Sequence, residues 1–213
     1  MGFEYLTNVP LAQARKEYLE RLVSGGFGSK TETIPVFESC GRVTAKAVYA
    51  HICAPHYAAS AMDGVAVSAK ETFGATETTP VTLKPDQFLV LDTGDPIPED
   101  KDAVIMVEDI VKNGDGSITI HAAAAPWQHI RQIGEDVCAG EMILPSHMTV
   151  SPAAIGAMIA GGVLEIEVIR KPVVGIIPTG DEIIPPCTDP KPGDILEFNG
   201  SIFSAMVRSW GAE

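Results

Sequence analysis

The sequence predicts a mixed α/β chain of several parts, in which a small β domain is inserted into a helical and β region. Three observations support this prediction: a helical apolar pattern near the start, short β-like segments between residues 65 and 125, and a strand-loop-helix pattern after residue 172. Residues 1–49 and 141–171 are expected to form one discontinuous linker and dimerisation domain. Residues 50–140 would form the inserted domain, barrel-like or a sandwich, and residues 172–213 would begin an incomplete α/β domain.

The first expected element is an amphipathic helix from Pro10 to Ser24. Its apolar residues recur at helical spacing, Pro10 suits a first turn, and the Gly25-Gly26 pair ends the pattern. Two short β-like runs follow at residues 33–37 and 43–49, before a loop rich in small residues at 54–64.

The inserted domain is expected to consist of short strands separated by turn residues. Asn113-Gly-Asp-Gly116 is a hairpin turn between the last two strands, and the spacing favours a small barrel or sandwich. The predicted strands are residues 65–67, 81–83, 88–91, 103–108 and 117–121.

A second helix and a strand-helix unit are expected after the inserted domain. Ser151 and Pro152 suit the first turn of a helix that Gly161-Gly162 ends, and a strand follows at residues 164–169. Val173-Val-Gly-Ile-Ile177 is a continuous apolar run typical of a strand buried on both faces, and a helix is expected from Ser201. Because a parallel strand needs a second strand beside it, we expect this α/β domain to continue past the end of the chain.

Composition limits the class of protein. The 213 residues are 46% hydrophobic and carry 15 basic against 28 acidic side chains, a formal charge of −13 that repels a nucleic-acid backbone. No segment has the roughly 20 apolar residues that a membrane span needs, and no leader pattern is present, so we expect a cytoplasmic protein without nucleic-acid or membrane partners. No two cysteines form a C-x-x-C pair, which favours reduced structural thiols at Cys40, Cys53, Cys138 and Cys187.

Three acidic, glycine-containing segments are candidates for chemistry: Ser60-Ala-Met-Asp-Gly64, Asp92-Thr-Gly-Asp-Pro-Ile-Pro98 and Thr179-Gly-Asp-Glu182. Glycine lets a ligand approach the backbone closely, while Asp and Glu can bind Mg²⁺ or transfer protons. Each segment is also a common turn sequence, because short polar side chains cap their own backbone. Taken singly, each is therefore more typical of a turn than of a site.

Together and in order, these segments resemble the molybdopterin molybdenumtransferase family, which includes the C-terminal domain of gephyrin. Ser60–Gly64 is similar to the family's S-A-M-D-G-Y-A signature, and Thr93–Glu108 to its T-G-x-x-x-P-x-G-x-D-A-V-V-x-x-E segment. Gly134–Gly140 resembles the G-x-D-x-x-x-G step, and Pro178–Glu182 with Pro192–Asn199 resembles the T-G-D-E and G-x-I-x-x-x-N pair. The resemblance covers essentially the whole chain and indicates an N-terminal fragment of such a protein.

The resemblance implies insertion of molybdate into adenylylated molybdopterin with release of AMP and with Mg²⁺ present, and it implies that residues 172–213 begin the molybdopterin-binding domain. It also implies a homodimer whose cleft lies between the β domain of one subunit and the molybdopterin-binding domain of the other, with molybdopterin adenylyltransferase as a further candidate partner. We expect the fragment alone to be inactive, because catalysis depends on positioning both nucleotide and dithiolene. The implied residues are Asp63, Thr93, Asp136 and Glu182 for catalysis, Ser60, Gly64, Gly94, Thr179 and Gly180 for cofactor contacts, and Asp181 and Glu182 for the metal.

Two alternatives stay open. The resemblance to gephyrin implies that this fold can also be a non-catalytic interaction or scaffold module, although the retained acidic motif residues favour the enzyme. His51, Cys53 and His56 are metal ligands by residue type, but their spacing matches no standard zinc pattern and no fourth ligand is evident.

Overall fold

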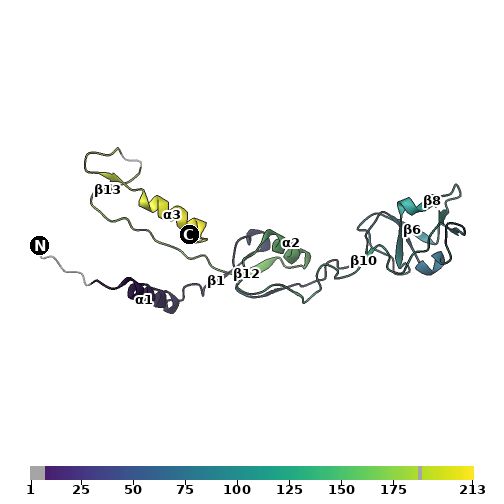
Figure 1. Ribbon diagram of the computed structural model, residues 1–213, viewed down its shortest axis with the longest axis horizontal. Coiled ribbons are helices and arrows are strands. Elements are labelled where there is room, and N and C mark those ends of the chain that lie inside the picture. Colours follow the sequence, from purple (N-terminus) through teal and green to yellow (C-terminus); the bar gives the residue numbers. More distant parts are fainter. Residues whose placement is uncertain (1–7, 187–188) are drawn as a thin grey trace. The chain divides into compact units, whose positions relative to one another are not determined.

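The computed structural model describes residues 8–186 and 189–213 and has the mixed α/β character that the sequence predicts (Figure 1). The chain folds into two compact units. Unit 1 comprises the chain up to Val48, Leu144–Ile155 and the chain from Leu164 onward, and unit 2 comprises Tyr49–Ile143 and Gly156–Val163. The predicted thiol at Cys187 lies outside the described residues.

The three helices found among the described residues were all expected. They are α1 (Leu11–Ser24), α2 (Pro152–Ala160) and α3 (Asn199–Ser209). The Ser151 hydroxyl accepts a hydrogen bond from the Ala154 N–H at 3.2 Å, which confirms the predicted cap of α2. Gly162 then leaves α2 with a φ of 76°, the left-handed conformation that favours glycine.

Unit 1 is organised around one antiparallel pair of strands. In it, β1 (Thr31–Pro35) pairs with β12 (Glu165–Ile169), with Thr31 opposite Ile169. The guanidinium of Arg42 ties this pair together, because it donates both to the Glu32 carboxylate and to the Ile169 carbonyl oxygen. A 3₁₀ turn, η1 (Val36–Glu38), follows β1. A short parallel pair, β13 (Ile183–Ile184) with β14 (Ile195–Leu196), lies in the C-terminal segment of unit 1.

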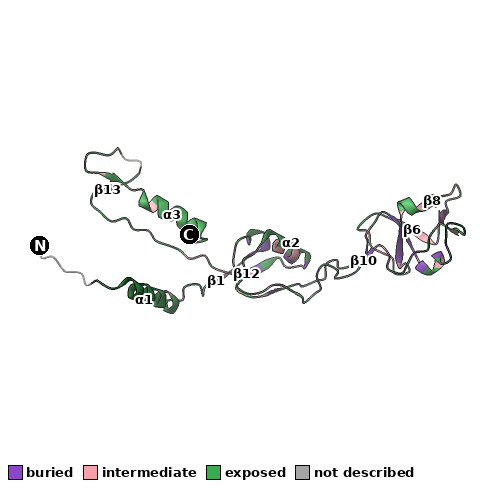
Figure 2. Cartoon of the chain, viewed as in Figure 1, coloured by how far each residue is buried: buried purple, intermediate pink, exposed green. Residues whose placement is uncertain are grey.

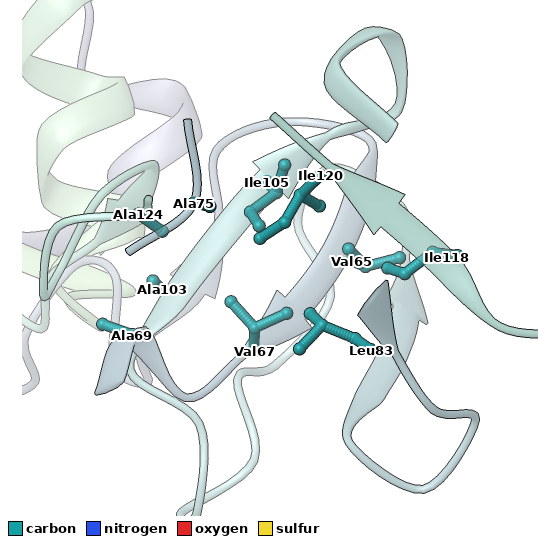
Figure 3. Close-up of a cluster of buried hydrophobic side chains, with 10 residues drawn as sticks. All are labelled: Val65, Val67, Ala69, Ala75, Leu83, Ala103, Ile105, Ile118, Ile120 and Ala124. Carbon is teal, nitrogen blue, oxygen red and sulfur yellow. The ribbon is translucent and has the colours of Figure 1, made fainter. Parts of the chain in front are cut away.

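Unit 2 contains a small sandwich of two three-stranded antiparallel sheets. One sheet has the order β6-β4-β7 and the other β5-β9-β8, and their buried faces share one core, in which Val67 and Ile105 meet Leu83 and Ile120 (Figure 3). These strands are β4 (Gly64–Val67), β5 (Val81–Leu83), β6 (Phe88–Leu91), β7 (Ala103–Met106), β8 (Ile110–Lys112) and β9 (Ile118–Ile120).

Shorter elements complete unit 2. Strand β3 (Ala59–Ser60) pairs with β10 (Ile130–Arg131). Strand β2 (Val48–Tyr49) pairs with β11 (Met142–Leu144), and each of these two strands has one residue assigned to unit 1. Two 3₁₀ turns, η2 (Ala69–Thr72) and η3 (Val107–Asp109), follow β4 and β7. The strand predicted to continue to Glu108 therefore ends at Met106, and the Asn113–Gly116 turn joins β8 to β9, of which only β9 was expected.

The strand predicted at residues 173–177 is absent, and this correction has a physical reason. A strand is stabilised by ladder hydrogen bonds to a neighbour, and within the described segments this run pairs only at its start, where Val174 N–H donates to the Glu213 carbonyl oxygen at 2.7 Å. Val173 and Ile177 are 73% and 83% exposed rather than buried on both faces. An apolar run alone does not fix a strand.

Burial differs between the elements, as Figure 2 shows. Helices α1 and α3 contain no buried residue, whereas all four residues of β4 are buried. Across residues 8–186 and 189–213, no helix combines the length and the apolar character that crossing a membrane requires.

Candidate functional site

The first two sequence motifs form one structure in unit 2, the paired loops, which we define as residues 60–64 and 92–98. One carboxylate oxygen of Asp63, Oδ1, accepts two hydrogen bonds from Thr93, one from its backbone N–H and one from its hydroxyl, each 2.7 Å long. The Gly94 N–H donates to the Ser60 carbonyl oxygen at 2.8 Å, and the Ser60 N–H donates to the Asp95 carbonyl oxygen at 2.9 Å. The two predicted catalytic residues Asp63 and Thr93 are therefore in direct contact.

The sheet of β4 and β6 explains why these loops meet. The two strands are antiparallel and Gly64 lies opposite Leu91, so the residue before β4 and the residues after β6 leave the sheet at the same end. Gly94 makes the turn with a φ of 94°, which favours glycine, and its carbonyl oxygen accepts a 3.0 Å hydrogen bond from the Tyr57 hydroxyl.

The Thr93 hydrogen bonds also set the charge of Asp63. The hydroxyl bond first and the backbone bond second hold the pKa of the exposed Asp63 carboxyl below its ordinary value, because both donors favour the ionised form. Asp63 is therefore a carboxylate at neutral pH, with one oxygen bound to Thr93.

The two other predicted residues of the first loop are enclosed. A methyl group on Gly64 would lie 2.0 Å from the Ile105 carbonyl oxygen in β7, so the neighbouring strand requires glycine there. Ser60 is fully buried, and its hydroxyl donates to the Met62 carbonyl oxygen at 2.6 Å. The contacts found at both residues are to protein backbone, and their cofactor contacts stay a prediction.

Asp136, from the third motif, forms an ion pair with Arg131, a residue that was not predicted from the sequence. Arg131 Nη2 lies 2.7 Å from Asp136 Oδ2 and its Nε lies 3.4 Å from Glu135 Oε1. The hydrogen bond to Asp136 is the main cause of a raised Arg131 pKa. Because Arg131 lies opposite Ala59 in the β10–β3 pair, it links the third motif to the strand that carries Ser60. The only sequence feature that could have indicated this ion pair is the position of Arg131 five residues before Asp136.

The remaining motifs meet each other in unit 1. The Ile195 N–H donates to the Glu182 carbonyl oxygen at 2.8 Å, which joins the T-G-D-E segment to the segment of residues 192–199. Gly180 has a φ of 140°, and a methyl group on it would lie 2.8 Å from a Glu182 carboxylate oxygen, so the glycine leaves room for that carboxylate. Thr179, Asp181 and Glu182 are all exposed on this turn.

A bound Mg²⁺ requires oxygen ligands such as carboxylates. Among residues 8–186 and 189–213, no group of three or more His, Cys, Asp or Glu side chains is arranged to hold a metal ion. The alternative site at His51, Cys53 and His56 is therefore not formed, and His51 Nδ1 lies instead 3.2 Å from the Gly162 carbonyl oxygen. Mg²⁺ is commonly bound by one or two carboxylates together with substrate phosphates. Asp181 and Glu182 are exposed carboxylates, and their role as metal ligands stays a prediction.

A hollow of about 510 Å³ lies elsewhere in unit 1. It lies between the turn that ends α1 and residues 169–173, and it includes the basic side chains of Arg21, Lys30, Arg170 and Lys171. None of the predicted site residues lines it, so it is not part of the candidate site.

The fold and the paired loops define a mixed α/β protein whose inserted antiparallel sandwich presents acidic loops at one end of a sheet. A family model described as "MoeA N-terminal region (domain I and II)" matches residues 9–162. The chain belongs to this family.

Similar proteins agree with the family match. The chain is 36% identical over 196 residues to molybdopterin molybdenumtransferase 2 of Mycobacterium tuberculosis, an alignment that covers 84% of this chain and 48% of that protein. It is 33% identical over 201 residues to molybdopterin molybdenumtransferase of Haemophilus influenzae, which covers 89% and 49%. The crystal structure of the molybdopterin biosynthesis MoeA protein from Pyrococcus horikosii superposes with a TM-score of 0.78 at 30% identity, over 97% of this chain and 56% of that one. The chain thus spans about half the length of the curated relatives it matches.

Proposed function

We propose that this chain is part of a protein of molybdenum cofactor biosynthesis, a transferase that inserts molybdate into adenylylated molybdopterin and releases AMP. The proposal is supported by the family match over residues 9–162 and by the names of the relatives in Mycobacterium tuberculosis and Haemophilus influenzae. The chain supplies the paired loops and the motifs that resemble the start of the molybdopterin-binding domain. In this proposal it does not catalyse the reaction by itself.

The observation that carries the proposal is the contact between Asp63 and Thr93. It joins two motifs that are about thirty positions apart in the sequence and leaves a charged carboxylate exposed at the end of a sheet. A carboxylate held in this way can orient water or a substrate hydroxyl through its second oxygen, while Thr93 fixes its direction. Asp136, whose carboxylate lies 2.7 Å from Arg131, would provide a second fixed carboxylate, beside the β10–β3 pair that carries Ser60.

The residues of unit 1 have a different role in this proposal. Asp181 and Glu182 would hold Mg²⁺ together with the phosphates of the adenylylated substrate, and Thr179 and Gly180 would contact that substrate. When bound, Mg²⁺ would offset the negative charge that develops as the phosphoanhydride is cleaved. Molybdopterin adenylyltransferase is the partner that would supply the adenylylated substrate.

The test uses the protein extended to the length of its relatives. Asp63→Asn keeps an acceptor oxygen for Thr93 and removes the charge, so we expect the melting temperature to stay within a few degrees and AMP release from adenylylated molybdopterin to fall at least about tenfold. Glu99→Gln is the matched control, because Glu99 is an exposed acid just outside the paired loops. AMP release near the parent level in Asp63→Asn would refute the catalytic role, and binding without any AMP release in the parent protein would favour the scaffold alternative.

A homodimer is the proposed assembly. Leu11, Tyr18, Val23 and Phe27 are between 59% and 84% exposed on and just after α1, and Ile159 of α2 is 48% exposed. A second copy would cover such apolar surface, which soluble proteins seldom leave open. Light scattering at micromolar concentration is expected to give twice the chain mass of 22.5 kDa. If light scattering gives the monomer mass for the parent chain and the same mass for Leu11→Lys, this assembly is contradicted.

A further inference from the structure

Two of the cysteines that the sequence separates by more than eighty positions face each other in unit 2. Ala54 and Val137 form an antiparallel bridge, in which the Ala54 N–H donates to the Val137 carbonyl oxygen at 2.8 Å and the Val137 N–H donates to the Ala54 carbonyl oxygen at 3.2 Å. Cys53 precedes Ala54 and Cys138 follows Val137, so the two cysteines flank this isolated bridge on the same side.

That position suits a disulfide. The two residues of the bridge exchange both hydrogen bonds, and residues that flank such a bridge on one side lie close together, as the non-hydrogen-bonded pair of a full ladder does at about 4.5 Å between Cα atoms. A disulfide accepts Cα separations of about 4.4–6.8 Å, and side chains opposite each other in a ladder point to the same face. The backbone arrangement therefore needs little movement to join the two sulfurs.

The sulfur atoms occupy one small space. A methyl group on Gly134 would lie 2.8 Å from Cys138 Sγ and 3.7 Å from Cys53 Sγ, so both sulfurs border the same glycine. The Ala139 N–H donates to Cys53 Sγ at 3.3 Å, which brings the backbone beside Cys138 onto the other sulfur. Gly134 adopts a φ of 75° and leaves the room that both thiols use.

Exposure differs between the two thiols in a way that fits stepwise oxidation. Both are free cysteines, Cys138 exposed and Cys53 half-buried. An external oxidant therefore reaches Cys138 first, and Cys53 lies next to it to complete the reaction.

We infer that Cys53 and Cys138 form a dithiol modification site, which low-molecular-weight disulfides convert reversibly into an intrachain disulfide. The Cys138 thiolate attacks one sulfur of glutathione disulfide, and one glutathione leaves as its thiolate. The Cys53 thiolate then attacks the Cys138 sulfur of the mixed disulfide and expels the second glutathione. The two cysteines lose two electrons and two protons, and the glutathione disulfide gains two electrons and two protons and becomes two glutathione thiols.

The disulfide would join the chain segments that enter and leave the sandwich of unit 2. Residues 49–58 lead to β3, and residues 132–143 follow β10, with the bridge between Ala54 and Val137 connecting them. Closing a loop of this length restricts the unfolded chain strongly, so oxidation should raise the melting temperature by roughly 5 °C or more.

The experiment equilibrates the chain with glutathione and glutathione disulfide at graded ratios, blocks free thiols by alkylation, and identifies linked tryptic peptides by mass spectrometry. The four cysteines lie on four different tryptic peptides, so each pairing is distinguishable. We expect a peptide linking Cys53 to Cys138 that disappears on addition of excess glutathione, together with the higher melting temperature. Cys40→Ser should retain both effects, whereas Cys138→Ser should lose both.

Three results would contradict the disulfide between Cys53 and Cys138. A stable glutathione adduct on Cys138 without the linked peptide, free thiols at every ratio, or a link from Cys138 to Cys40 or Cys187 would each overturn the inference. A Cys53–Cys138 link that leaves the melting temperature unchanged would overturn the proposed restriction of the two segments.

Discussion

Replacing Gly64 by alanine tests whether this residue belongs to the sheet or to a ligand site. The added methyl carbon would lie 2.0 Å from the carbonyl oxygen and 2.9 Å from the carbonyl carbon of Ile105, and 3.0 Å from the Met106 Cα. All three atoms are backbone of β7, which is paired to β4 along its full length, so no flexible side chain can move aside. Relief requires β4 and β7 to separate at this end, and we expect a loss of about 3 kcal/mol or more in the free energy of unfolding.

Gly114→Ala is the matched control in the same unit. Nothing lies within 4 Å of a methyl group at Gly114, so its free energy of unfolding should change by less than about 0.5 kcal/mol. The assay is urea unfolding followed by circular dichroism, with a melting temperature about 6 °C or more lower expected for Gly64→Ala. If Gly64→Ala and Gly114→Ala are equally stable, the packing argument is wrong and the ligand role of Gly64 becomes the better explanation.

Two further changes probe the core and the response to acid. Ile120 is fully buried in the sandwich core, so Ile120→Ala should lower the free energy of unfolding in urea by about 2–5 kcal/mol. Val111 is 51% exposed, so the control Val111→Ala should lower it by less than about 1 kcal/mol. Similar losses for the two variants would contradict the core assignment. Hydrogen bonds from Lys46 and then Thr31 lower the pKa of the Glu167 carboxyl in the folded state. The ionised Glu167 therefore stabilises the folded chain above the pKa of about 4.3 that the unfolded chain has. This stabilisation is lost as pH falls through the lower pKa of the folded state. The melting temperature of Glu167→Gln should therefore fall less than that of the parent chain between pH 5 and pH 3, and parallel curves would contradict this linkage.

Local patterns predicted the helices well because each helix carries its own signals. Pro10 and Gly25-Gly26 delimit α1, and Ser151 with Gly162 delimits α2, so a few neighbouring residues determine each boundary. Strands β5 and β6 were also predicted at the residues where they occur. The run at residues 173–177 failed for the opposite reason, because a strand depends on a partner that local sequence does not contain.

The candidate site was predicted as a set of residues but not as a set of contacts. Asp63 and Thr93 were singled out separately, while the pair of 2.7 Å hydrogen bonds depends on the β4–β6 register. Arg131 was overlooked because a single basic residue among acidic neighbours has many surface explanations, and only the β10–β3 pair places it beside Ala59. The functional roles of all the predicted site residues stay predictions: Ser60, Asp63, Gly64, Thr93, Gly94, Asp136, Thr179, Gly180, Asp181 and Glu182.

The structural and the functional interpretation of the Asp63-Gly64 segment support each other. Gly64 can lie close to the β7 backbone at Ile105 and Met106 because it has no side chain, and β4 lies between β6 and β7 in the sheet. Asp63 comes directly before that fixed point, and Thr93 follows Leu91 by two residues, so sheet packing sets the distance across which they bond. The exposed carboxylate is therefore positioned by the packing of the sheet and by its hydrogen bonds to Thr93. A substitution at Gly64 would displace Asp63 without altering its carboxyl group, which distinguishes loss of position from loss of charge at the same site.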